Sequence, residues 1–325
     1  QRPPLSKQFL LSDDTLDSHG DGEYLLRKPD WYDTNKITFL YGSDVTNIDP
    51  EVKTVSLSSG DVYGYDHLVL ATGATPRMLP KAAGLERVHV LRSPTDAEVL
   101  RSAIKTSRRA VIIGGGYIGL EAAASLKKSG IKVDVIEVAD RVLARVASPA
   151  ISDFFQKLHQ ENDVDVHTGT SVEEINSSQD KFTGAILSNG SVIEADLLIV
   201  GIGVSPNVEL GYRAGVDCQN GIVVGSDMQT NIKGIFAIGD VALSTSLAPQ
   251  IKGTPIRVES VHNAQDSAAR AVAAITGSDA PLWQSPWFWS EQYDVRLQSA
   301  GIVPPQTDAV VHIIRPSKRP GGQSV

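Results

Sequence analysis

A strand, a glycine-rich turn, a helix and a second strand are expected between residues 111 and 137, in the sequence VIIGGGYIGLEAAASLKKSGIKVDVIE. Gly114, Gly116 and Gly119 match the spacing G-x-G-x-x-G, which gains weight when a strand precedes it and a helix follows. Gly114 permits the turn, Gly116 leaves room for a pyrophosphate at the helix N-terminus, and Gly119 allows close helix–strand packing. The pattern predicts a dinucleotide site. The alternative is a glycine turn that binds nothing.

The acidic residue at the end of the second strand indicates which dinucleotide would bind. Glu137 can accept hydrogen bonds from an adenosine ribose, and its charge would repel a 2′-phosphate. This favours NADH over NADPH. Arg141 and Arg145 follow closely and weaken the preference.

Two other buried strands end in small residues, LVLATGATPR at 68–77 and GIFAIGD at 234–240. Such an ending lets a ligand approach the carboxyl edge of a parallel sheet. Asp240 would offer a carboxylate to a polyol hydroxyl group. A lone Gly-Asp pair is usually a plain turn, but these two strands flank a complete nucleotide unit. We therefore predict a second nucleotide site.

Composition limits the classes of protein to consider. The chain has 325 residues, 41% hydrophobic and 21% charged, so two or more domains are expected. The net charge of -8 argues against nucleic-acid binding, and no apolar run approaches the ~20 residues of a membrane span. Cys218 is the single cysteine, which excludes an intrachain disulfide or a Cys-x-x-Cys pair within this sequence. This cysteine usage is compatible with the cytoplasm, and a cytoplasmic protein is expected. The histidines are scattered without the spacing of metal ligands, so no metal site is predicted.

The elements that must position these residues alternate between strands and helices. Between residues 37 and 73, short strands separated by turn sequences predict hairpins. Helices are predicted at 97–107, 154–161 and 260–277, the last closed by Gly277. Parallel strands that alternate with helices, together with hairpin layers, predict an α/β fold with Rossmann-like sheets.

Seven short motifs follow one another along the chain: RPPLSK, LVLATGATPR, GGGYIGLEAAA, GIGVSPN, AIGD, ESVHNAQ and PWFWSEQYD. The chain resembles the FAD-dependent, NADH-oxidising ferredoxin reductases of the putidaredoxin reductase and rubredoxin reductase type. These belong to the pyridine nucleotide-disulfide oxidoreductase superfamily. The first and last motifs are the specific ones, and the middle ones are shared with glutathione-reductase-like flavoproteins.

The resemblance implies two Rossmann-like domains, with an NADH domain inserted into an FAD domain, and a partial α+β C-terminal domain. The boundaries it implies are 1–104 and 229–283 for the FAD domain, 105–228 for the NADH domain and 284–325 for the C-terminal interface domain. The family's first glycine fingerprint would precede RPPLSK, and the chain is expected to be truncated at both ends.

The resemblance also assigns residues to the flavin site. Lys7 matches a lysine beside the flavin ring, and Glu121 matches its ion-pair partner; these two are the candidate catalytic residues. Without the resemblance, they would be interpreted as a loop lysine and a helix-surface charge. The Val261 amide, at the helix start near Ser260, would face the flavin pyrimidine. The other residues expected to contact FAD are Val45, Ala71, Thr72, Gly73, Arg77, Arg92, Gly239, Asp240 and Trp287.

A second set is assigned to NADH. Tyr117 would gate the nicotinamide pocket, with ordinary packing as its alternative, and Glu259 would face the nicotinamide side. Trp287 and Trp289 would shield the flavin and form a docking face for the electron acceptor, or else belong to the core. The remaining residues expected to contact NADH are Gly114, Gly116, Ile118, Gly119, Glu137, Arg145, Gly201 and Gly203.

The function implied is electron transfer from NADH through FAD to a ferredoxin-type [2Fe–2S] protein or a rubredoxin that feeds an oxygenase or cytochrome P450. The protein would be a monomer or a homodimer. A disulfide, peroxide or coenzyme A reductase of the same superfold needs a redox thiol near the flavin, and Cys218 is expected in the NADH domain, away from it. A non-catalytic flavoprotein of the apoptosis-inducing-factor type shares the motifs and stays open as an alternative.

Overall fold

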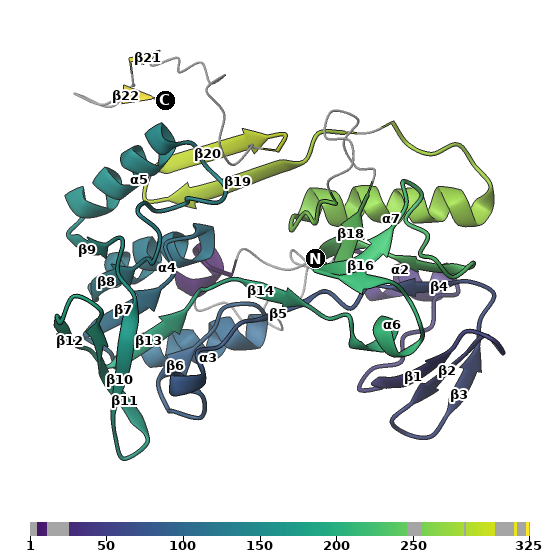
Figure 1. The fold of residues 1–325 in the computed structure, drawn as a ribbon, viewed down its shortest axis with the longest axis horizontal. Helices are drawn as coiled ribbons and strands as arrows, with labels where there is room; N and C mark the ends of the chain where they lie inside the picture. Colours follow the sequence, from purple (N-terminus) through teal and green to yellow (C-terminus); the bar gives the residue numbers. More distant parts are fainter. Residues whose placement is uncertain are drawn as a thin grey trace.

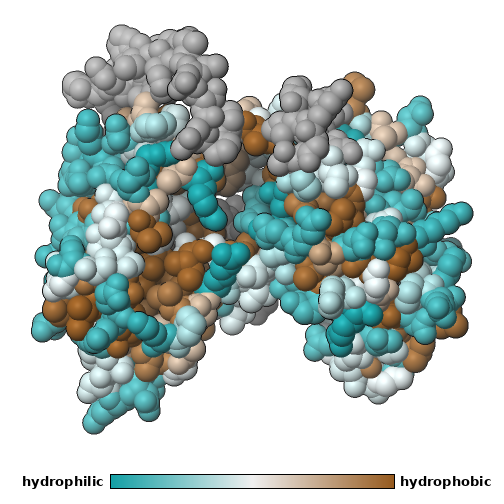
Figure 2. All heavy atoms as spheres, in the orientation of Figure 1, coloured by the Kyte–Doolittle hydropathy of each residue, from teal (hydrophilic) through white to brown (hydrophobic). Residues whose placement is uncertain are grey.

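Two groups of elements form separate lobes that meet at a narrow waist in the computed structural model of the protein (Figure 1, Figure 2). The structure describes residues 5–11, 26–245, 255–282 and 284–302, together with the short strands β21 (Arg315–Pro316) and β22 (Gln323–Ser324). We call residues 5–11, 79–202 and 287–300 the parallel-sheet lobe, and residues 26–72, 208–245 and 255–282 the mixed-sheet lobe.

The parallel-sheet lobe is built on five parallel strands, in the order β6, β13, β7, β8 and β9. Their bounds are Val88–His89, Leu197–Val200, Arg109–Ile113, Lys132–Ile136 and Val164–His167. Alternate residues of β7 point to opposite faces, so that Ile112 joins one hydrophobic cluster and Val111 another. Burial on both faces explains why these strands are almost continuously apolar in sequence.

Helices cover one face of this sheet and an antiparallel sheet packs against the other (Figure 1). The helices are α1 (Gln8–Leu11), α3 (Pro94–Ile104), α4 (Tyr117–Lys128) and α5 (Pro149–Glu161). The antiparallel strands are β10 (Val172–Ser178), β11 (Lys181–Leu187) and β12 (Val192–Glu194), next to the 3-10 turn η1 (Pro80–Ala82). A hairpin of β19 (Trp287–Gln292) and β20 (Val295–Ala300) packs on α4.

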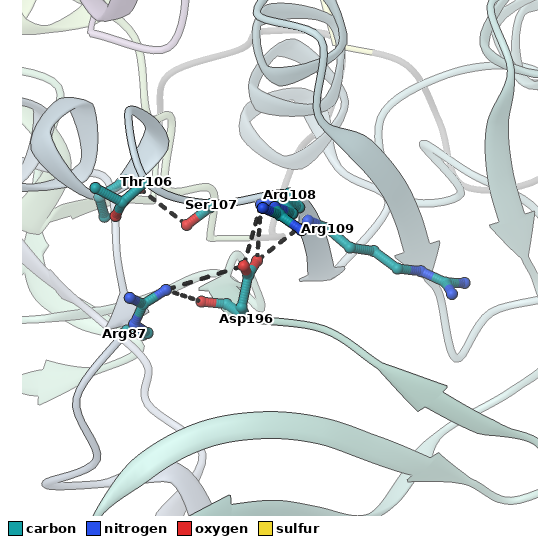
Figure 3. A network of polar contacts seen from close by, with 7 residues as sticks. Arg87, Thr106, Ser107, Arg108, Arg109 and Asp196 are labelled. Atoms are coloured by element: carbon teal, nitrogen blue, oxygen red, sulfur yellow. Dashed lines mark hydrogen bonds and ion pairs between the residues drawn. The ribbon is translucent and has the colours of Figure 1, made fainter.

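One carboxylate connects the start of β7 with the start of β13 (Figure 3). Asp196 accepts the backbone N–H groups of Arg108 and Arg109, each at 3.1 Å, while its own carbonyl accepts from the Arg87 guanidinium at 3.2 Å. Because Asp196 immediately precedes β13, these bonds help to set the register in which Leu197 lies opposite Ala110. This register carries Gly201, just past β13, to the turn that follows β7.

The mixed-sheet lobe contains several small sheets around one core (Figure 1). Strands β1 (Val45–Asp49), β2 (Thr54–Leu57) and β3 (Val62–Gly64) form hairpins, and β4 (Leu68–Leu70) pairs in parallel with β17 (Ile235–Ala237). A third sheet has β15 (Cys218–Gln219), β16 (Gly221–Val224) and β18 (Ala242–Ser244). The helices are α2 (Pro29–Thr34), α6 (Glu209–Arg213), the turn η2 (Gly239–Val241) and α7 (Val261–Thr276).

A two-stranded ribbon crosses the waist between the lobes (Figure 1). It consists of β5 (Ala74–Pro76) and β14 (Val204–Pro206), which pair antiparallel. Asn207 reinforces it, since its side chain donates to the Thr72 carbonyl at 2.8 Å and accepts from the Thr75 hydroxyl at 2.8 Å. An ion pair of 2.7 Å between Arg92 and Asp240 also joins the two lobes.

The predicted helices are present, but some of their ends differ from those predicted. Ser93 and Asp96 form a capping box, which starts α3 at Pro94 instead of residue 97. Pro149 starts α5 five residues before the predicted 154, because proline suits the first helical turn. Gly277, in the left-handed region at φ 68°, ends α7 as expected. The hairpins begin only at Val45, and residues 37–41 form no strand.

The boundaries expected at 104/105 and 228/229 do not match the packing of the described elements. Strand β6 and helix α3 precede residue 105, yet they belong to the five-stranded sheet and its core. Strand β16 precedes residue 229, yet it pairs with β18 of the mixed-sheet lobe. The chain enters the parallel-sheet lobe along β5 of the ribbon and leaves it along β14. The unit inserted between these two strands therefore extends from about residue 79 to residue 202.

The Asp196 contacts generate a stability prediction. Asp196→Ala should lower the free energy of unfolding by about 1 kcal/mol, because two backbone donors at the strand start lose a carboxylate partner. Asp165→Ala is the matched control: it removes an exposed carboxylate 3.9 Å from Lys132 and should change stability by less than about 0.5 kcal/mol. Urea unfolding measures both. Equal values for the two variants would contradict the role given to Asp196.

Candidate functional site: two nucleotide-binding strand ends and a buried ion pair

The glycine turn between β7 and α4 has the geometry expected of a pyrophosphate site. Gly114 has a φ of 108°, and a side chain there would collide with the carbonyl of Gly201. A side chain on Gly119 would collide with the carbonyl of Gly114. In contrast, nothing lies within 4 Å of the position that a Cβ on Gly116 would occupy. The open volume therefore lies in front of Gly116, at the N-terminus of α4, where backbone N–H groups favour an anion.

Glu137 lies beside this turn, directly after β8. Its Oε2 accepts the Gly115 N–H at 2.6 Å and its Oε1 accepts the Ala139 N–H at 2.8 Å. A carboxylate has further lone pairs for a ribose hydroxyl, so these bonds orient Glu137 without exhausting it. The residues around Gly116 thus fit the adenosine and pyrophosphate of NADH.

The two arginines that follow Glu137 differ in position. The Arg141 guanidinium donates to the carbonyls of Ala144 (2.9 Å) and Ala147 (3.0 Å) and to the Ser152 hydroxyl (2.6 Å), so it holds a local turn. Arg145 lies near Gly203, where a Cβ would be 3.6 Å from its Nη2. Only Arg145 of these two lies near the glycines that were predicted to contact NADH.

A second strand end lies in the mixed-sheet lobe. The parallel pairing of β4 and β17 brings Gly73 and Asp240, which lie far apart in sequence, to one sheet edge. Arg92 Nη2 bonds Asp240 Oδ2 at 2.7 Å and lies 3.6 Å from the position of a Cβ on Gly73. The Gly239 N–H donates to Ser267 of α7 at 3.0 Å. Glycine backbone, a carboxylate and a guanidinium together fit the ribose, pyrophosphate and polyol parts of FAD.

The candidate catalytic residues are in contact. Lys7 Nζ lies 3.3 Å from Glu121 Oε1, and the two side chains are 13% and 5% exposed. Lys7 Nζ also lies 5.2 Å from the centroid of the Trp289 ring, within the range of a cation–π contact. Both members of the pair lie in the parallel-sheet lobe, because the segment before α1 packs with α3 and α4. The pair therefore lies within one lobe, although the expected boundaries assigned Lys7 to the FAD domain and Glu121 to the NADH domain.

The aromatic residues of β19 make two separate ring contacts, one of which reaches α4. The Trp287 and Trp289 rings stack with their centroids 5.0 Å apart, and the centroids of the Phe288 and Tyr117 rings are 4.4 Å apart. Burial, and after it the charge of Glu121, raises the pKa of Tyr117. Tyr117 is thus partly packed, as its alternative interpretation proposed, while it still starts the helix next to Gly116.

The N-terminus of α7 is capped in the way the sequence indicated. The Ser260 hydroxyl accepts the Asn263 N–H at 3.1 Å, which leaves Val261 as the first helical residue, 45% exposed. Glu259 pairs with Arg257 at 2.7 Å, and Arg257 also donates to the Asp240 carbonyl at 3.1 Å. The start of α7 is thereby connected to the strand end that carries Asp240.

Some predicted residues lie elsewhere. Val45 begins β1, in a different sheet from the strands that end at Gly73 and Asp240. Arg77 lies on the ribbon, where its Nε donates to Ser205 at 3.2 Å and its N–H to the Gly203 carbonyl at 2.9 Å. Ile118 is exposed on the first turn of α4, and Ala71 and Thr72 precede Gly73.

Sequence reasoning missed the polar residues that hold these side chains. Ser6 and Ser290 both donate to Glu121, and Asn207 holds the ribbon. The small polar residues carry no spacing signal of their own. Their only signal in the sequence is their place beside predicted site residues, next to Lys7, Trp289 and the GIGVSP segment.

In the part of the chain that the structure describes, no helix is long and apolar enough to cross a membrane. The same residues contain no group of three or more His, Cys, Asp or Glu side chains arranged to hold a metal ion.

Comparison with known proteins gives family matches over most of the chain. The model of the pyridine nucleotide-disulphide oxidoreductases matches residues 1–268, and that of the reductase C-terminal domain matches residues 287–321. Rhodocoxin reductase of Rhodococcus erythropolis is 40% identical over 328 residues, which cover 100% of this chain and 74% of the relative. Putidaredoxin reductase of Pseudomonas putida is 41% identical, over 92% of this chain and 71% of the relative.

Solved structures agree with these matches. The ferredoxin reductase for the CYP199A2 system from Rhodopseudomonas palustris has a TM-score of 0.88 at 40% identity, over 98% of this chain and 76% of that one. A covalent putidaredoxin reductase–putidaredoxin complex also has a TM-score of 0.88 at 40% identity, over 97% of this chain and 74% of that one.

Two of the three fingerprint glycines provide a matched pair of variants. Gly116→Ala should lower NADH affinity at least about tenfold, because its methyl group enters the open volume, and change stability by less than about 1 kcal/mol. Gly119→Ala should destabilise the fold by about 1–3 kcal/mol, because its methyl group meets the Gly114 carbonyl. Calorimetric titration and urea unfolding separate the two effects. A stable Gly116→Ala variant with unchanged affinity would place the pyrophosphate elsewhere.

Proposed function

Since the chain belongs to the pyridine nucleotide-disulphide oxidoreductase family, we propose that it passes electrons from NADH through FAD to a ferredoxin-type [2Fe–2S] protein or a rubredoxin. The iron–sulfur protein would in turn feed an oxygenase or a cytochrome P450. The observation that carries the proposal is the pair of nucleotide-type strand ends, one in each lobe, with Lys7 and Glu121 buried together as an ion pair. The names of relatives agree, among them a rubredoxin-NAD(+) reductase that is 36% identical over 96% of this chain.

Bound FAD would supply hydride acceptance from NADH at its N5 atom and release of single electrons. The protein would hold the two nucleotides in place. Gly116 and the N-terminus of α4 would bind the pyrophosphate of NADH, and Glu137 its ribose. Gly73, Arg92 and Asp240 would bind FAD at the other strand end.

Lys7 and the N-terminus of α7 would stabilise the reduced flavin. The Lys7 cation near the flavin ring would favour negative charge on it, and the partial positive charge at the start of α7 would act in the same direction. Contact with the Glu121 carboxylate and the Trp289 ring restricts where the Lys7 ammonium group can lie. The stacked pair of Trp287 and Trp289 would form the docking face for the acceptor. The cytoplasmic location and the monomeric or homodimeric state stay predictions.

The environment of the only cysteine argues against a thiol mechanism. Cys218 begins β15 and, partly buried, packs against the core of the mixed-sheet lobe, although it was expected in the inserted domain. Burial, followed by the charges of Asp217 and Glu209, raises the pKa of the thiol. A raised pKa lowers the thiolate fraction at neutral pH, and the thiolate is the reactive form.

The proposed function predicts a preference between dinucleotides. Protein reconstituted with FAD should reduce a [2Fe–2S] ferredoxin at least about tenfold more efficiently with NADH than with NADPH, because Glu137 repels a 2′-phosphate and Arg141 is engaged elsewhere. Steady-state kinetics with both dinucleotides measures kcat/KM. A tenfold preference for NADPH would overturn the assignment of Glu137. Slow turnover with a long-lived charge-transfer absorption would instead favour a non-catalytic flavoprotein.

Thiol independence is a second expectation. Cys218→Ser should leave NADH-driven reduction of ferredoxin within about twofold of the unsubstituted protein, because the thiol and the Lys7–Glu121 pair lie in different lobes. Flavin content and the unfolding midpoint serve as controls for folding. Loss of activity at normal flavin content would bring a thiol mechanism back.

A further inference from the structure

A chain of buried polar side chains leads away from Glu121, starting at Oε1, the same carboxylate oxygen that Lys7 contacts. Glu121 Oε1 accepts the Ser290 hydroxyl at 2.6 Å, and Ser290 Oγ accepts the Gln292 side-chain N–H at 3.1 Å. Gln292 Oε1 lies 2.8 Å from His159 Nε2, and His159 Nδ1 lies 3.1 Å from the Tyr293 hydroxyl. Ser290, Gln292 and His159 are each 0% exposed.

The direction of every hydrogen bond in this chain follows from its chemistry. Gln292 Oε1 can only accept, so His159 Nε2 must carry the proton of the ring. Burial lowers the pKa of His159 to about 4, so the imidazole is neutral at pH 7 and its Nδ1 accepts. Burial raises the pKa of Tyr293, so its hydroxyl keeps its proton and donates to Nδ1. The Ser290 hydroxyl has a single proton, and it donates that proton in its hydrogen bond to the Glu121 carboxylate.

All the donors therefore point the same way, from Tyr293 through His159, Gln292 and Ser290 to the carboxylate. Hydrogen bonds aligned in one direction polarise one another, and a buried carboxylate is stabilised by donors that face it. Ser6 donates to the other oxygen of Glu121 from the segment that carries Lys7. Among the described residues, the carboxylate interacts with the charged Lys7 and, one turn earlier on α4, with the titratable Tyr117.

We propose that Ser290 is a positioning residue which, backed by Gln292, His159 and Tyr293, holds the Glu121 carboxylate toward Lys7. The proposal rests on the proposed function, because Lys7 is the group assigned to the flavin. The same strand carries Trp289, whose ring lies 5.2 Å from Lys7 Nζ. The β19–β20 hairpin thus supplies both the hydroxyl that orients Glu121 and the ring against which Lys7 lies, and α5 anchors it through His159.

Ser290→Thr and Ser290→Val test this directly, since the two variants have nearly the same shape and only threonine retains the hydroxyl. Ser290→Val should slow flavin reduction by NADH about tenfold in stopped-flow absorbance, and Ser290→Thr should restore it to within about twofold. In a Glu121→Gln background, Ser290→Val should cause no further loss, because it acts through the carboxylate. Ser299→Val, on the adjacent strand β20, is the control for a new branched side chain in the hairpin.

A second measurement needs neither NADH nor turnover. Nitrogen-15 NMR of labelled histidine, assigned with His159→Gln, should show the neutral Nε2–H tautomer of His159 at pH 7. An Nδ1–H tautomer would overturn the proposal, as would equal rates for the threonine and valine variants, or a valine effect that persists unchanged in the Glu121→Gln background. Absence of NADH-driven flavin reduction in the unsubstituted protein would contradict the proposed function instead, and the NMR result would still decide the direction of the chain.

Discussion

The contact of three backbone segments at Gly114, Gly119 and Gly201 is the constraint on which the nucleotide site depends. The carbonyls of Gly201 and Gly114 occupy the space that side chains on Gly114 and Gly119 would need. This contact lets α4 begin against the ends of β7 and β13, which leaves its N-terminal N–H groups facing the open volume at Gly116. Glu137 completes the arrangement because its carboxylate binds the same turn. A sheet packed with ordinary side chains at these points could not present the helix start to an anion.

The two lobes are connected by polar contacts more than by a shared core. The ribbon of β5 and β14 crosses the waist, and Asn207 bonds both Thr72 and Thr75 at its end. The ion pair between Arg92 and Asp240 is partly buried and joins the segment before α3 to the strand end of the other lobe. Partly buried polar contacts of this kind fix orientation while they add little net stability. The residues proposed to bind FAD thus include one, Arg92, that belongs by packing to the inserted unit.

Glu121 shows how the fold accommodates a buried charge. A carboxylate that is 5% exposed is costly unless charge and hydrogen bonds compensate it. Two segments distant in sequence provide that compensation: the segment before α1, which carries Lys7 and Ser6, and strand β19, which carries Ser290. The buried charge therefore requires the N-terminal segment and the C-terminal hairpin to pack together on the inserted unit. Cys218, by contrast, is packed among apolar residues as a small hydrophobic side chain.

The sequence by itself determined the local features: the glycine turn, its strand and helix, the acidic residue after β8, and the closure of α7 at Gly277. These depend on backbone conformation and on neighbours within a few residues, which spacing and residue type encode. Tertiary structure decided where the units divide, because the pairings of β6 with β13 and of β16 with β18 join distant segments. It also decided the partners of Glu121, since Ser290 and His159 have no periodic pattern and meet only when the hairpin packs on α4 and α5.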